Sequence, residues 1–131
     1  ELVCVGHRVP DPRGVVEVLL EDLGLESRAD ALPEALSSGQ RRRLLLASVL
    51  ARPRSLLILD EPEQRLDAGM RDRLTDLLRE EAAAGGAVLV VTHDPALVRG
   101  AATGGIVLAE ADQAAAARVT ADEAADAIES L

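Results

Sequence analysis

The hydrophobic positions of this chain recur first with the period of a helix and then as unbroken apolar runs. Residues 16–23 carry apolar side chains at i, i+3, i+4 and i+7, which predicts an amphipathic helix that ends near Gly24. Residues 40–52 predict a second helix, with three arginines at its start and Pro53 directly after it. Residues 1–9 form a short segment of mixed apolar and polar residues, which suits a short strand or the remnant of one.

Two continuous apolar runs, at residues 55–59 and 87–91, each end abruptly in polar residues. Such runs are typical of parallel strands that are buried on both faces. The segments that follow them are Asp60-Glu61-Pro62 and Thr92-His93-Asp94-Pro95. A shorter run at residues 106–108 predicts a third strand.

Further helices are predicted between and after these strands. Asp67 stands where it would cap a helix, and Gly85-Gly86 would end that helix. The tail, residues 111–131, is Ala-rich and acidic, and Thr120 with Glu123 forms a capping-box pattern that predicts a helix there. The alternation of strands and helices therefore predicts an α/β fold with parallel strands flanked by helices.

Composition limits the kinds of protein that this chain suits. Hydrophobic residues make up 48% of the 131 residues, and the absence of Phe, Tyr and Trp predicts an aliphatic core. The net charge of −9 argues against direct nucleic-acid binding by the chain as a whole. The single Cys4 suits a reducing cytoplasm, and no apolar run approaches the ~20 residues that span a bilayer. Because the chain begins at Glu1 rather than at Met, we expect a soluble piece of a longer protein.

One turn combines residue types that can bind an anion. Ser37, Ser38, Gly39 and Gln40 open the Arg-rich helix, where hydroxyls, free amides and the helix dipole favour phosphate. The same residues equally suit an ordinary helix cap. Taken alone, the turn leaves both interpretations open.

Acidic residues and a histidine follow the two apolar runs. In open α/β sheets, ligands bind at the carboxyl ends of the strands. Asp60 there suits a Mg²⁺ ligand, and Glu61 suits a group that orients or deprotonates water, although both also suit a solvated turn. His93 lies at the same edge and suits either a phosphate contact or an ordinary polar surface position.

Taken in order, these segments closely resemble the ABC ATPase family. The Leu-Ser-Ser-Gly-Gln turn, the strand ending Asp-Glu-Pro, Leu66-Asp67 and the strand ending Thr-His-Asp match the signature loop, Walker B, D-loop and H-loop of that family. The resemblance runs from about Val15 to Leu108. It implies a partial P-loop NTPase (ABC ATPase) fold that includes part of the helical signature subdomain.

The resemblance also implies roles for individual residues. Asp60 would coordinate Mg²⁺ through water, Glu61 would be the catalytic carboxylate, and His93 would contact the γ-phosphate of ATP. The remaining predicted binding residues would touch the ATP of the opposite subunit or lie at the dimer interface: Ser37, Ser38, Gly39, Gln40 and Asp67.

The family's phosphate-binding P-loop, Gly-x-x-x-x-Gly-Lys-Ser/Thr, does not occur in these 131 residues, and all 14 basic residues are arginines. The family's Gln-loop and adenine-stacking aromatic residue also have no counterpart. The P-loop strand of the family lies between the strands that match residues 88–91 and 106–108, so we expect a gap there. Residues 2–5 are one candidate to fill part of it.

Three smaller departures from the family pattern concern the predicted site. Ser38 replaces a usual glycine of the signature loop, and Glu63 follows Pro62 where Ser or Thr is common. Arg65 stands where the D-loop usually has a small residue, which puts close packing across the dimer in doubt. The cluster Arg41-Arg42-Arg43 is interpreted as a solvated helix face.

We divide the chain into an N-terminal remnant or short strand (1–14), a helical signature part (15–52), a Walker B to H-loop core (53–110) and a helical tail (111–131). The leading hypothesis is the C-terminal part of the ATP-hydrolysing subunit of an ABC transporter, using ATP and Mg²⁺. Its expected partners are a second ATPase subunit, in a head-to-tail dimer, and a membrane subunit at the inner face of the cell membrane. The alternatives are a non-catalytic module that offers its signature loop to a partner's ATP, and a soluble ABC ATPase acting on DNA or ribosomes. Without a P-loop, the isolated chain is expected to be inactive.

Overall fold

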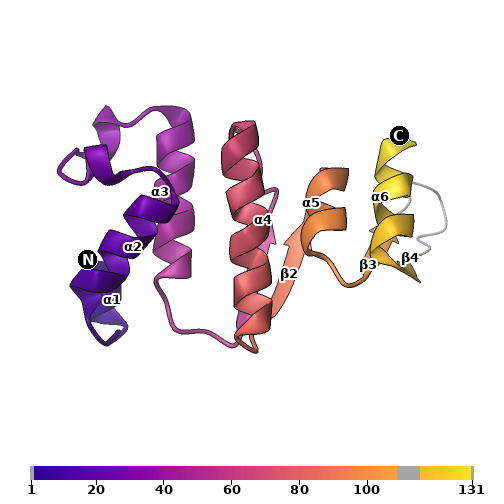
Figure 1. The fold of residues 1–131 in the computed structure, drawn as a ribbon, viewed down its shortest axis with the longest axis horizontal. Helices are drawn as coiled ribbons and strands as arrows, with labels where there is room; N and C mark the ends of the chain where they lie inside the picture. Colours follow the sequence, from indigo (N-terminus) through magenta and orange to yellow (C-terminus); the bar gives the residue numbers. More distant parts are fainter. Residues whose placement is uncertain (1, 109–115, 131) are drawn as a thin grey trace.

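The computed structural model describes residues 2–108 and 116–130. Figure 1 shows the elements arranged in a row, from a helical N-terminal end to a C-terminal end in which one helix packs on two short strands. In chain order the elements are α1 (Leu2–Gly6), α2 (Pro12–Asp22), the 3-10 turns η1 (Glu26–Arg28) and η2 (Pro33–Ala35), α3 (Ser38–Leu50), β1 (Leu56–Asp60), α4 (Ala68–Ala83), β2 (Ala87–Val91), α5 (Pro95–Ala101), β3 (Gly105–Leu108), β4 (Ala116–Val119) and α6 (Ala121–Glu129). The predicted α/β class with parallel strands flanked by helices is confirmed.

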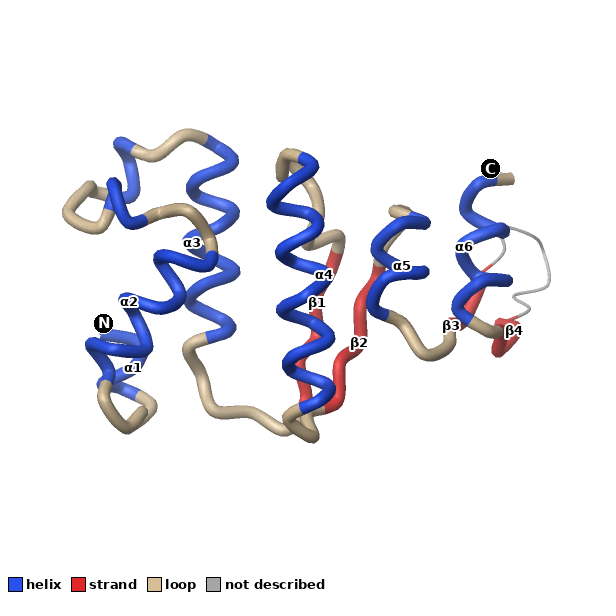
Figure 2. Tube along the Cα trace, in the orientation of Figure 1, coloured by secondary structure: helices blue, strands red, loops and turns tan. Residues whose placement is uncertain are grey.

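The strands form two separate pairs (Figure 2). β1 and β2 are parallel, with Leu56 opposite Ala87 and Asp60 opposite Val91. Parallel pairing needs a crossover, and α4 supplies it. β3 pairs with β4 in the antiparallel sense and not with β2, so the predicted gap between the second and third strands is present among the described residues.

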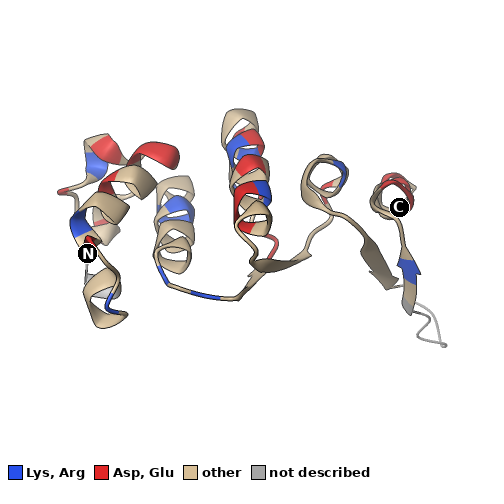
Figure 3. Cartoon of the chain, turned by 60° about the horizontal axis from the view of Figure 1, so that its bottom comes forward, with Lys and Arg blue, Asp and Glu red and all other residues tan. Residues whose placement is uncertain are grey.

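The β1–β2 sheet is covered on one face only. Leu57 is 1% exposed, whereas its neighbour Leu56 is 51% exposed and Leu89 on β2 is 53% exposed. Figure 3 shows α4, α5 and α6 on the same side of the strands. The expectation that both faces are buried is therefore wrong for the described part of the chain, because helices pack there against a single face and side chains alternate between faces.

The core is aliphatic, as the composition predicts. Its buried leucines come from the loop after α2, from α3, from β1 and the loop that follows it, and from α4 and α5: Leu23, Leu25, Leu46, Leu57, Leu59, Leu66, Leu74, Leu77, Leu78 and Leu97. Arg73 on α4 makes an ion pair at 2.7 Å with Asp22, which ties α4 to the end of α2, and a second at 2.9 Å with Glu80 on α4 itself. Apolar contact thus joins the helical part to the strands without any aromatic side chain.

The N-terminal segment differs from the predicted short strand. Leu2–Gly6 forms helix α1, which packs beside α2, where the Val9 amide donates to the Cys4 carbonyl at 2.9 Å. Residues 2–5 therefore do not fill the gap in the sheet, and that expectation is wrong. They lie instead at the end of the molecule farthest from β3 (Figure 1).

The C-terminal tail is only partly helical. Helix α6 begins at the predicted cap, where the Glu123 amide donates to Thr120 Oγ1 at 3.2 Å and the Thr120 amide donates back to Glu123 Oε2 at 2.8 Å. Ala116–Val119, however, forms strand β4, because it pairs along the whole length of β3. This tertiary pairing overrides the helical preference of alanine. Residues 109–115 of the predicted tail lie outside the described residues.

Candidate functional site

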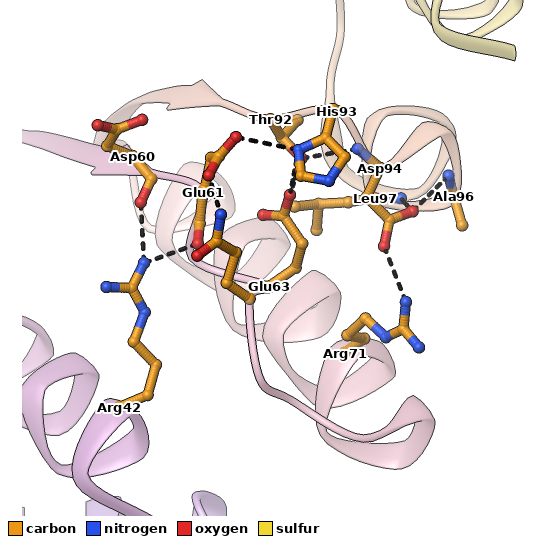
Figure 4. A network of polar contacts seen from close by, with 11 residues as sticks. Arg42, Asp60, Glu61, Glu63, Arg71, Thr92, His93, Asp94, Ala96 and Leu97 are labelled. Carbon is orange, nitrogen blue, oxygen red and sulfur yellow. Dashed lines mark hydrogen bonds and ion pairs between the residues drawn. The ribbon is translucent and has the colours of Figure 1, made fainter. Parts of the chain in front are cut away.

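The predicted catalytic residues meet at the carboxyl edge of the parallel strands. Because β1 and β2 are paired in register, the residues that follow them are neighbours, and the Glu61 amide donates to the Val91 carbonyl at 2.8 Å. Glu61 Oε1 lies 3.0 Å from His93 Nδ1 (Figure 4). The two side chains are 38% and 66% exposed, so both remain open to a ligand or to water.

Glu61 has an unusual backbone conformation. Its φ is 43°, in the left-handed region that L residues rarely adopt. Its carboxylate also contacts the Gln64 side-chain amide, three residues later. Strained backbone conformations of this kind cluster at functional sites, where the surrounding contacts hold them in place.

A buried carboxylate lies behind the histidine. Glu63 is 5% exposed and accepts a hydrogen bond from Thr92 Oγ1 at 2.6 Å, while Thr92 Oγ1 accepts from the Asp94 amide at 3.0 Å. Glu63 Oε1 is also 3.9 Å from His93 Nδ1. The sequence marked Glu63 only as a departure from the family pattern, and its pairing with Thr92 was missed because it joins residues 29 positions apart.

Asp60 occupies the last position of β1. Its position alternates with those of Leu57 and Leu59, so its side chain lies on the uncovered face of the sheet, and it is exposed. Among residues 2–108 and 116–130, no group of three or more His, Cys, Asp or Glu side chains is arranged to hold a metal ion. A single carboxylate nevertheless suits Mg²⁺, which keeps several waters and takes its other oxygens from phosphates.

The Ser-Ser-Gly-Gln turn caps helix α3. The Gln40 amide donates to Ser37 Oγ at 3.2 Å, and the Ser37 amide donates to Gln40 Oε1 at 2.9 Å, which makes a capping box. The helix-cap interpretation is therefore confirmed for these two residues. Ser38 is exposed in the first turn, where amides have no intrahelical partner and stay available to an anion. A Cβ on Gly39 would come within 3.1 Å of the Arg65 carbonyl oxygen, so the turn abuts the loop before Asp67.

Asp67 caps helix α4, as its position predicts. Its Oδ1 accepts from the Met70 amide at 2.9 Å, and the residue is exposed. The cap leaves the second carboxylate oxygen available. The structure brings Glu61 and His93 together, and it places Asp67 and Ser37 apart from that contact, each bonded within its own helix start.

The arginine cluster is not a uniformly solvated face. Arg42 Nη2 donates to the carbonyl oxygens of Asp60 and Glu61, and Arg43 Nη1 donates to the Leu23 carbonyl at 3.0 Å. Of the three, Arg41 alone is exposed, and Arg42 and Arg43 are partly buried. The solvated-face interpretation is wrong for Arg42 and Arg43, because their guanidinium groups satisfy carbonyls that the ends of neighbouring elements leave open.

Known proteins resemble this chain over most of its length. Residues 7–99 match a family model described as "AAA domain, putative AbiEii toxin, Type IV TA system". The chain is 44% identical over 95 residues to the aliphatic sulfonates import ATP-binding protein SsuB 2 of Mesorhizobium japonicum, covering 72% of this chain and 38% of that protein. It is 38% identical over 82 residues to the octopine permease ATP-binding protein P of Rhizobium radiobacter, covering 63% and 31%. The chain belongs to the ABC ATPase family.

Solved ABC structures share the fold of this ABC ATPase chain. An archaeal ribosome recycling factor, aABCE1, in complex with the stalk protein aP1, has a TM-score of 0.77 at 25% identity over 92% of this chain and 24% of that one. An inward-facing metal-chelate type ABC transporter has a TM-score of 0.67 at 27% identity, covering 90% and 49%. The chain thus spans less than half the length of each of these relatives. In the described residues, no helix is long and apolar enough to cross a bilayer.

Proposed function

We propose that this chain is the C-terminal part of the ATP-hydrolysing subunit of an ABC transporter, which couples ATP hydrolysis to movement of a substrate across a membrane. The observation that carries the proposal is the 3.0 Å contact of Glu61 with His93, beside the exposed carboxylate of Asp60. The relatives of higher identity are the ATP-binding proteins of sulfonate import and of octopine permease. Both lines of support point to the same reaction, attack of water on the γ-phosphate of ATP.

Each residue of the edge has a task in this proposal. Asp60 binds Mg²⁺ through water, and the ion, when present, neutralises charge on the phosphates. Glu61 orients the attacking water and accepts its proton, for which an exposed carboxylate held by fixed neighbours is suited. His93 is held by Glu61 through Nδ1 and contacts the γ-phosphate through its other nitrogen. When Nδ1 donates its hydrogen to Glu61, Nε2 is an acceptor in the neutral ring. Nε2 can donate a hydrogen bond to a phosphate oxygen only in the imidazolium form.

The phosphates also need a cradle, and these 131 residues offer neither a P-loop nor a lysine. We propose that a further segment of the domain supplies both, with its P-loop strand in the gap beside β2 and its remainder packed on the uncovered face of β1–β2. The exposed apolar side chains of that face support this: Leu56, Ile58, Leu89 and Val91. The chain alone is then inactive, because it holds the water-activating edge without the phosphate-binding loop.

The proposed partners follow from the remaining residues. A second ATPase subunit in a head-to-tail dimer would place its ATP against Ser37, Ser38, Gly39 and Gln40, and Asp67 would lie at the dimer interface. A membrane subunit would bind the helical part and hold the assembly at the inner face of the membrane. The names of the relatives, a sulfonates import ATP-binding protein and an octopine permease ATP-binding protein, support such a partner.

A second candidate is a soluble ABC ATPase that acts on ribosomes. It is favoured by the 0.77 TM-score to the ribosome recycling factor. The 25% identity to that protein, against 44% to the sulfonate import protein, supports the transporter subunit instead. The third candidate, a non-catalytic module, needs only the capped signature turn, and the hydrolysis experiment below separates it from the others.

The proposal is tested by ATP hydrolysis in this chain extended upstream through a P-loop. Glu61→Gln keeps the size of the side chain and removes its basicity, so kcat should fall by about two orders of magnitude or more, with little change in ATP affinity. Glu17→Gln, on the exposed side of α2, is the matched control and should keep full activity. Hydrolysis that is equally fast in both variants would contradict the role of Glu61. Binding of ATP without turnover in the unsubstituted chain would favour the non-catalytic module.

A further inference from the structure

Arg42 links two parts of the site that are distant in sequence. It lies in the second turn of α3, and its Nη2 atom donates to the Asp60 carbonyl oxygen at 2.9 Å and to the Glu61 carbonyl oxygen at 2.6 Å. Figure 4 shows the guanidinium group reaching from its helix to the backbone at the end of β1. The side chain touches the backbone of the catalytic residue and not its carboxylate.

This contact depends on the conformation of Glu61. Consecutive carbonyl groups of an extended strand point in opposite directions, so one nitrogen cannot bond to both. At φ 43° the chain turns at Glu61, and the two oxygens converge on one guanidinium nitrogen. Two fixed contacts therefore hold this left-handed residue: the Val91 carbonyl accepts its amide, and Arg42 bonds to its carbonyl.

The start of α3 abuts the same loop at a second point. The backbone of Gly39 approaches Arg65 so closely that a Cβ would lie 3.1 Å from the Arg65 carbonyl oxygen. Arg65 itself has a left-handed φ of 63°. The loop from Glu61 to Arg65 is thus held against α3 at both ends, so a shift of α3 changes the loop that carries the carboxylate.

We propose that Arg42 is a positioning residue, which holds Glu61 in the conformation that directs its carboxylate at His93 and transmits displacement of the Ser37–Gln40 turn to it. The catalytic meaning of this link rests on the proposed function. Through Arg42, a nucleotide bound at the Ser37–Gln40 turn would alter the position of Glu61, which acts on a second nucleotide. A charged donor suits this task, because its bonds to carbonyl oxygens are stronger than those of a neutral group.

Amide hydrogen exchange of the chain tests the positioning role without ATP. Arg42→Met keeps the length and apolar stem of the side chain and removes its donors. The Glu61 amide, which is bonded to Val91, should then exchange about tenfold faster, while amides in the middle of α4 keep their protection. Arg41→Met is the matched control, because Arg41 is the exposed neighbour on the same helix. Equal Glu61 protection in the two variants would overturn the proposal.

A conservative variant covers the case in which Arg42→Met loosens the whole chain. Arg42→Lys keeps the charge but shortens the side chain and replaces the weakly hydrated guanidinium with a strongly hydrated ammonium group. In Arg42→Lys, the proposal requires that the Glu61 amide exchange faster than in the parent chain but slower than in Arg42→Met. The α4 amides should keep their protection. Wild-type protection at Glu61 in Arg42→Lys, together with general loosening in Arg42→Met, would overturn it.

The transmission is tested by a double-mutant cycle with the helix cap. Ser37→Ala removes the hydroxyl that accepts from the Gln40 amide and frays the first turn of α3. In the parent chain it should speed Glu61 exchange several-fold, and in Arg42→Met it should add almost nothing, because the link is already broken. Equal effects of Ser37→Ala in the two backgrounds would show independent sites and overturn the link. A failed ATP assay leaves these exchange results standing, so the two proposals fail separately.

Discussion

The two faces of the β1–β2 sheet have the same kind of side chain and opposite surroundings. Leu57 and Leu59 pack against the aliphatic core, whereas Leu56 and Ile58, in the same strand, are mostly exposed. An apolar run with no alternation normally marks a strand that is buried twice. The sequence of β1 therefore predicts a strand that is buried on both faces. In the part of the chain that the structure describes, helices cover only one of them. The segment that we propose to pack on the second face would account for this difference.

The largest expected effect comes from a matched pair of leucines in β1. Leu57→Ala leaves a cavity in the core and should lower the free energy of unfolding by about 2–5 kcal/mol. Leu56→Ala, one residue earlier, removes the same atoms from an exposed position and should cost about 0.5 kcal/mol or less. Urea unfolding of the two variants measures both. Similar losses would mean that the Leu56 face is covered in solution.

A smaller effect is expected from an apolar dye on the uncovered face. Exposed contiguous apolar side chains bind such dyes, so the chain should enhance the fluorescence of anilinonaphthalene sulfonate. Changing Ile58 and Leu89 together to Gln should reduce this enhancement several-fold. The control changes Leu32 and Leu45 to Gln, since these leucines are exposed but lie outside the sheet. A control pair that reduces the signal as much as the sheet pair would contradict a specific apolar face.

The smallest effect concerns α6, which covers β3 as α4 covers β1–β2. Hydrogen bonds from the Thr120 amide and hydroxyl hold the pKa of Glu123 below its ordinary value of 4.5, and the Arg99 guanidinium does the same for the pKa of Glu129. A lowered carboxylate pKa in the folded state stabilises that state above pH 4.5, and the contribution is lost as the pH falls below it.

Acid should therefore loosen α6 before it affects the core. Chemical shifts of the α6 amides, followed from pH 6 downward, should show fraying that begins below about pH 4.5, while the amides of α4 keep their positions. In Glu123→Gln the cap should lose most of this pH dependence. An α6 that stays unchanged to the pH at which the core unfolds would contradict the role of these carboxylates.

Local features of the fold were predictable from the sequence. The caps at Asp67 and Thr120 depend on residues three positions apart, and the strand ends at Asp60 and Val91 depend on a change from apolar to polar residues. The ABC motifs placed Glu61 and His93 at one edge, where the structure also has them. Such features follow from chain-local chemistry or from the register of parallel strands.

Features that depend on distant partners were not predictable. Arg42 looked like one of three solvated arginines, because its carbonyl partners are 18 and 19 residues away. The strand Ala116–Val119 has a helix-forming composition and is extended only because β3 lies beside it. The one-sided burial of β1 depends on which layers are present, and no pattern within the strand carries that information.

Calorimetric titration of Mg²⁺-ATP shows whether these 131 residues can hold the nucleotide without a P-loop. It compares this chain alone with the chain extended upstream through a P-loop, under the same conditions. Only the extended chain should bind, because Asp60, Glu61 and His93 act on phosphates that another segment must hold. Equally tight binding by the chain alone would contradict this expectation, since some other part of these 131 residues would then have to hold the phosphates.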